Sequence, residues 1–140
     1  MMALSIVLML MSGMWACDPE PTSAPPGASA PAEPGKPSVP AQPVTRQTRD
    51  TYQFYCAQCH GLKGKGDGIN ARFLTVPPRD HTKTDYLETR SDAQLFDAIK
   101  LGGLAVGRAP CMPAWGHTFN DDTIRSLVRH IRELCHCEAF

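Results

Sequence analysis

The chain has 140 residues, and its 14 Lys plus Arg balance 14 Asp plus Glu, so its formal net charge is zero. Without a basic excess, or a basic stripe with interleaved aromatic residues, the sequence argues against nucleic-acid binding. The composition changes along the chain and divides it into three parts, residues 1–17, 18–45 and 46–140.

Residues 1–17 have the composition of an export segment. They contain no Lys, Arg, Asp or Glu, and residues 4–11 are almost entirely apolar. Such a run is short for crossing a bilayer but suits the apolar region of a signal peptide, although the usual basic start is missing. Met14-Trp15-Ala16-Cys17 is similar to a bacterial lipoprotein cleavage box, which would make Cys17 a lipidated membrane anchor. An ordinary secretory signal or an uncleaved anchor is the alternative.

Residues 18–45 are rich in Pro and Ala. Nine of the 13 Pro residues lie between Pro19 and Pro43. Such a segment buries too little apolar surface to offset the entropy of ordering, and Pro favours extended backbone. We therefore expect a disordered, semi-stiff linker between the anchor and the domain at 46–140.

Cys56, Cys59 and His60 form the sequence Cys-Ala-Gln-Cys-His at the end of a helix expected over about 46–57. The pattern C-x-x-C-H is the attachment signature of c-type haem. Two thiols three positions apart lie about one helical turn apart, so both can bond one porphyrin edge while the histidine ligates the iron. A redox dithiol needs a βαβ setting and a zinc site needs two more nearby ligands, and the sequence shows neither. We predict one covalent haem c, with His60 as an axial ligand.

A second helix is predicted from an N-cap at Ser91 or Asp92 to the glycine pair Gly102-Gly103. Its inward residues are expected to be Leu95, Phe96 and Ile99.

Met112 is the second candidate iron ligand. The other five Met lie in the first 14 residues, so removal of the export segment leaves one thioether, in a loop with the sequence Cys-Met-Pro-Ala-Trp-Gly. A His/Met pair is the ligation of electron-transfer cytochromes c. His81 and His117 also lie in loops and remain alternative ligands.

The last predicted helix has Asn120 as N-cap and two acidic residues in its first turn, which suits the positive end of the helix dipole. Its predicted apolar stripe consists of Ile124, Leu127, Val128, Ile131 and Leu134. Its predicted solvent-facing residues are Arg125, Arg129, His130 and Arg132.

Three cysteines remain outside the haem motif and the export segment. Because export favours disulfides, we predict that Cys111 bridges to Cys135 or Cys137 and thereby restrains the Met112 loop. The rival interpretation is a soft-metal site for copper or zinc, built from Cys111, Cys135, His136 and Cys137.

Residues 50–135 resemble a class I monohaem cytochrome c. The matching segments are Tyr-Cys-Ala-Gln-Cys-His-Gly at 55–61, Gly-Lys-Gly-Asp-Gly at 64–68, Pro-Pro-Arg-Asp at 77–80, Ile-Lys-Leu-Gly-Gly at 99–103 and Met-Pro-Ala-Trp at 112–115. The resemblance implies an all-α, monomeric domain with crossed N- and C-terminal helices and loops around one haem. It also implies that a backbone carbonyl of the Pro77–Pro78 segment orients His60 through its second ring nitrogen.

The resemblance implies an electron carrier rather than an enzyme, with Cys56 and Cys59 holding the haem and His60 and Met112 ligating its iron. Expected partners are a quinol-oxidising complex and a terminal oxidase or reductase, reached from the periplasm or the outer face of the cytoplasmic membrane. Two alternatives remain. One is a haem protein with an open or exchangeable distal site, and the other is a copper-handling protein that uses the Cys111, Cys135 and Cys137 thiols.

Overall fold

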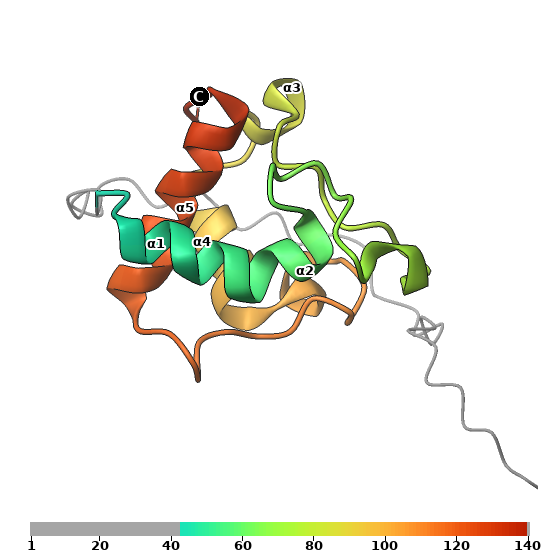
Figure 1. The fold of residues 1–140 in the computed structure, drawn as a ribbon. Helices are drawn as coiled ribbons and strands as arrows, with labels where there is room; N and C mark the ends of the chain where they lie inside the picture. Colours follow the sequence, from blue (N-terminus) through green and yellow to red (C-terminus); the bar gives the residue numbers. More distant parts are fainter. Residues whose placement is uncertain (1–42, 140) are drawn as a thin grey trace, which may run out of the picture.

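The computed structural model describes residues 43–139, which form helices joined by loops, with no strand among them (Figure 1). The predicted all-α architecture is confirmed. The predicted export segment with Cys17, and the Pro-rich linker up to residue 42, lie outside the described residues. Within residues 43–139, no helix combines the length and apolarity that crossing a membrane requires.

The N-terminal helix runs in three consecutive pieces, α1 (Arg46–Thr51), the π-helical turn η1 (Tyr52–Cys56) and α2 (Ala57–His60). The Thr45 hydroxyl accepts the Thr48 N–H and begins the helix. Gly61, with a positive φ of 79°, ends it. The helix is therefore longer than predicted, and His60 is its last residue.

The π-helical turn keeps the buried side of this helix continuous. The Ala57 N–H donates to the Tyr52 carbonyl, five residues back, so this turn holds one residue more than an α-helical turn. The buried residues Thr48, Tyr52 and Ala57 are spaced by four and then five positions. The extra residue is what brings Ala57 onto the same side as Thr48 and Tyr52.

Four shorter elements connect the two ends of the fold. They are η2 (Ala71–Phe73), α3 (Thr84–Leu87), α4 (Asp92–Leu101) and η3 (Gly103–Val106). Ser91 caps α4, because its hydroxyl accepts the Gln94 N–H at 3.2 Å. As predicted, Ile99 is buried while Leu95 and Phe96 pack against the core.

The last helix, α5 (Asp121–Cys135), crosses the N-terminal helix and also packs on α4 (Figure 1). The predicted N-cap is confirmed, because the Asn120 side chain accepts the Thr123 N–H at 2.9 Å. The buried stripe comprises Ile124, Leu127, Val128 and Ile131. The predicted crossing of the terminal helices is therefore present in the fold.

Polar contacts join α1 to α5 at the crossing. The Thr48 hydroxyl donates to Ser126 Oγ at 3.3 Å, and Arg49 Nη1 lies 2.7 Å from Glu133 Oε2. The rings of Tyr52 and His130 form a T-shaped pair, with centroids 4.8 Å apart. His130, predicted at the surface, is therefore buried, because α1 and η1 cover that side of α5.

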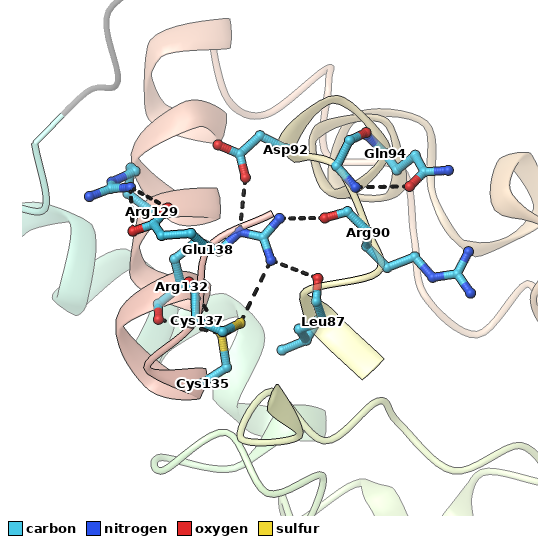
Figure 2. Close-up of polar contacts among 10 residues, drawn as sticks. Leu87, Arg90, Asp92, Gln94, Arg129, Arg132, Cys135, Cys137 and Glu138 are labelled. Atoms are coloured by element: carbon cyan, nitrogen blue, oxygen red, sulfur yellow. Dashed lines mark hydrogen bonds and ion pairs between the residues drawn. A yellow bond between two sulfur atoms is a disulfide. The ribbon is translucent and has the colours of Figure 1, made fainter. Parts of the chain in front are cut away.

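Arg132 was also predicted to face water, and that prediction was wrong: only 2% of the residue is exposed. Its guanidinium lies between α5 and the segment that joins α3 to α4 (Figure 2). There it donates to the carbonyls of Leu87 and Arg90, and its Nε lies 2.9 Å from Asp92 Oδ1. These partners satisfy the buried charge and attach α5 to the segment before α4.

The cysteines at the end of α5 pair with each other, Cys135 with Cys137. The predicted bridge from Cys111 to either of them is therefore wrong. The bridge spans His136, whose backbone is left-handed with φ of 52° and ends the helix. This turn brings Cys137 back to Cys135, a local pairing that helix periodicity does not reveal.

Candidate functional site: a haem cavity

A cavity with an empty volume of about 1220 Å³, counting its open mouth, lies inside the helices and loops. Its lining brings together the four residues that the sequence predicted to hold haem: Cys56, Cys59, His60 and Met112. Most of the other lining residues are apolar, among them Leu87, Ile99, Leu127 and Ile131. Residues separated by more than fifty positions thus meet at one largely apolar cavity.

Neither motif cysteine forms a disulfide, so both thiols are available to bond a porphyrin. Burial is the main reason that the pKa of Cys56 rises to about 12, and the neighbouring Cys59 adds to it. Burial also raises the pKa of Cys59. Two neutral thiols one helical turn apart on an apolar wall fit a porphyrin joined to both sulfur atoms.

His60 is oriented by a backbone carbonyl. Its Nδ1 lies 2.8 Å from the carbonyl oxygen of Arg79, to which it donates in the tautomer that leaves Nε2 free to bind a metal. The predicted carbonyl was that of Pro77 or Pro78, so the prediction was wrong by at least one residue. Arg79 itself is restrained, because its guanidinium lies 3.9 Å from the ring centroid of Tyr86.

Burial lowers the pKa of His60, an effect that the hydrogen bond to Arg79 partly opposes. The ring is therefore held neutral at physiological pH. A neutral imidazole with one nitrogen engaged in a hydrogen bond is the form that ligates iron.

The Met112 loop is attached to the end of α4 by backbone hydrogen bonds. The Gly103 N–H donates to the Met112 carbonyl at 3.0 Å, and the Trp115 N–H donates to the Ile99 carbonyl at 3.0 Å. Gly102 has a positive φ of 84°, and a side chain there would meet the Ala114 backbone nitrogen at 2.9 Å. The glycine pair thus ends α4 and also lets the Met112 loop approach.

The alternative iron ligands His81 and His117 are not placed opposite His60 across the cavity. The rings of His81 and His60 are stacked, with centroids 4.1 Å apart and planes 16° from parallel, so both come from one wall. His117 is exposed and does not line the cavity. Sequence reasoning missed the pairing of His81 with His60, because no periodic or motif signal connects these two positions.

The predicted soft-metal site is not assembled. Cys111 lines the haem cavity, whereas Cys135 and Cys137 are joined to each other at the end of α5. Among residues 43–139, no group of three or more His, Cys, Asp or Glu side chains is arranged to hold a metal ion.

A protein-family model described as cytochrome C oxidase, cbb3-type, subunit III matches residues 43–131. No curated protein matches the chain significantly.

Two solved structures are similar to this chain. The first is the Kuenenia stuttgartiensis reducing HAO-like protein complex Kustc0457/Kustc0458, with a TM-score of 0.54 and 24% identity over 66% of this chain. This chain spans only 43% of that one. The second, the KustC0563 c-type cytochrome, has a TM-score of 0.49 and 18% identity, over 62% of this chain and 95% of that one.

The family model covers more than half of the chain, including the C-x-x-C-H motif, Met112 and most of α5. Proteins with a cytochrome c domain are typically exported and hold haem c covalently. The chain belongs to the family described as cytochrome C oxidase, cbb3-type, subunit III, and it is a class I c-type cytochrome.

Proposed function

We propose that the chain is a monohaem electron carrier in which Cys56 and Cys59 hold the haem while His60 and Met112 ligate its iron. The observation that carries this proposal is the convergence of these four side chains on one largely apolar cavity. The hydrogen bond from His60 to Arg79 supports the imidazole ligand, because it leaves Nε2 for the iron.

Met112 is the second ligand that the geometry favours. The stacking of His81 on His60 argues against bis-His ligation by His81, because a ring flat against the first ligand cannot reach the far face of a porphyrin. His117 is exposed outside the cavity. A thioether on the cavity wall, in a loop held by two backbone hydrogen bonds, is the remaining candidate.

Each residue of the site has a role in electron transfer, and none of these roles requires the conversion of a substrate. When bound, haem supplies the one-electron couple of its iron, whose potential depends strongly on its axial ligands. The two cysteines keep the group from dissociating, and the Arg79 carbonyl orients His60. The apolar wall, including Leu87, Ile99 and Ile131, excludes water from the site.

The proposal also covers the part of the chain that precedes the haem domain. The proposal places residues 1–17 as an export segment, with Cys17 as the lipidated anchor, and residues 18–45 as the linker to the haem domain. The carrier would then work in the periplasm, on the outer face of the cytoplasmic membrane. Its partners would be a quinol-oxidising complex and a terminal oxidase or reductase, and the oxidase in the family description favours a terminal oxidase.

The optical spectrum tests the ligation. In protein made by cells competent in cytochrome maturation, haem should resist extraction with acidified acetone. The oxidised form should show the far-red band of an iron–sulfur bond. Met112→His should keep the haem but lower the reduction potential by a sizeable fraction of the roughly 0.8 V over which axial ligands act. His117→Ala is the matched control and should leave the potential unchanged.

Three results would contradict this proposal. Haem that washes out would remove Cys56 and Cys59 from their role. An unchanged potential in Met112→His would remove Met112. Rapid carbon monoxide binding by the reduced wild-type protein would favour an open distal site instead.

A further inference from the structure

His81 is a polar residue deep in the domain that the ligation of the haem does not use. Only 8% of it is exposed, and its ring lies flat on that of His60 at a centroid distance of 4.1 Å. Burial is the main cause that puts its pKa well below the usual value, and the nearby His60, His130 and Arg79 lower it further. A neutral imidazole therefore covers one side of the His60 ring.

Two hydrogen bonds hold His81 in this place. Its Nδ1 lies 2.9 Å from the hydroxyl oxygen of Tyr52, a residue with 1% exposure. Its backbone N–H donates to the Gly64 carbonyl at 2.6 Å. Gly64 has a positive φ of 74°, and a Cβ there would lie 3.0 Å from His81 Cβ, so only a glycine lets this loop pack so closely.

The hydrogen bond between His60 and Arg79 restrains the His60 ring at one atom, Nδ1. A single bond at Nδ1 fixes the tautomer, but it resists only weakly a rotation of the ring plane about the Cβ–Cγ bond. A flat contact against the ring face opposes that rotation. His81 is the ring that makes such a contact.

We propose that His81, held by the Tyr52 hydroxyl, is a positioning residue that sets the plane of the His60 ring. This inference rests on the proposed role of His60 as an iron ligand. Tyr52 would act on His60 indirectly, because its hydroxyl forms a hydrogen bond with His81 and not with His60. If both residues were only core filler, their substitutions would act independently.

The plane of an axial imidazole can be observed in the oxidised holoprotein. It sets how unpaired spin spreads over the porphyrin, so the proton resonances of the haem methyl groups report its orientation. His81→Ala should shift these resonances clearly, with haem attachment and the iron–sulfur band retained. Tyr52→Phe should shift them less and in the same sense. The double variant should match His81→Ala alone, since the hydroxyl acts through His81.

Two variants make the test decisive. His117→Ala removes an exposed histidine outside the cavity and should leave the resonances at their wild-type positions. His81→Phe keeps a flat ring against His60 and should stay closer to wild type than His81→Ala. Adding Tyr52→Phe to His81→Phe should change nothing further, and this comparison decides the matter if His81→Ala does not accumulate.

Wild-type resonance positions in His81→Ala, or shifts that add in the double variants, would overturn the inference. Either result leaves the proposed function intact, because it is judged on wild-type haem attachment and on the Met112→His potential. Wild-type protein without covalent haem would instead contradict the proposed function itself.

Discussion

At the scale of single residues, Arg132 shows that a charged side chain can be buried where its charge predicts that it faces water. Val128, Arg132 and Cys135 follow one another at spacings of four and three, so they lie on one side of α5. Val128 and Cys135 are buried, and so is Arg132 between them. Periodicity alone places Arg132 beside the apolar stripe, and its charge led to the opposite prediction. The sequence does not reveal that two backbone carbonyls and a carboxylate lie close enough to satisfy the Arg132 guanidinium.

Arg132→Met should destabilise the holoprotein by about 3 kcal/mol, because it leaves the buried carbonyls of Leu87 and Arg90 without their donor. Urea unfolding measures the loss. The matched control is Arg129→Met on the same helix. Arg129 pairs with Glu138 near the surface and its side chain is 37% exposed, so its loss should cost at most about 1 kcal/mol. Equal losses in the two variants would contradict the buried role of Arg132.

At the scale of elements, the sequence predicted what local chemistry determines. Ser91 and Asn120 cap α4 and α5 because their side chains accept N–H groups three residues ahead. The C-x-x-C-H pattern is also local: its spacing along one helix puts both thiols and the histidine on the cavity wall. Contacts distant along the chain could not be read in this way. The Tyr52 hydroxyl meets His81 across 29 positions.

The π-helical turn is a second feature that local propensity did not reveal. Its extra residue brings Ala57 onto the side of Thr48 and Tyr52 at the crossing with α5, while Cys56, Cys59 and His60 line the cavity. Both requirements come from tertiary structure. The π-helical turn sets the rotation of the helix after it relative to the helix before it, so that both requirements are met.

Deletion of Gln53 tests this explanation. Gln53 is exposed, and its removal should turn the π-helical turn into an α-helical turn with Tyr52 and His60 still on their present sides. Haem attachment, measured from the absorbance of purified protein, should be retained. An Ala inserted after Gln53 should rotate the two halves by about 100° relative to each other, because the turn cannot absorb a second residue. Haem attachment should then be lost.

The opposite pattern, with the insertion tolerated and the deletion not, would show that the turn does not set this rotation. Gln53→Ala controls for the loss of the side chain and should leave haem attachment unchanged.

At the scale of the whole molecule, the core and the haem cavity share residues. Within the described part of the chain, residues 43–139, ten buried hydrophobic residues form the core, and five of them also line the cavity. These five are Tyr52, Leu87, Ile99, Leu127 and Ile131. A domain of about 100 residues buries a smaller share of its surface than a larger one, so its protein core is modest. The haem is therefore expected to complete the core as well as to carry the electron.

The last prediction follows from this shared core. A cofactor that binds the folded chain but not the unfolded one adds its binding free energy to stability. Cys56→Ser/Cys59→Ser protein prepared without haem should lose most of its helical circular dichroism, and its free energy of unfolding should fall to near zero from the about 5–15 kcal/mol of typical domains. Haem-loaded Cys135→Ala/Cys137→Ala protein, the matched double substitution outside the cavity, should remain helical. A cooperative urea transition in the haem-free protein, at the same midpoint as in the loaded wild type, would show that the helices need no haem to fold.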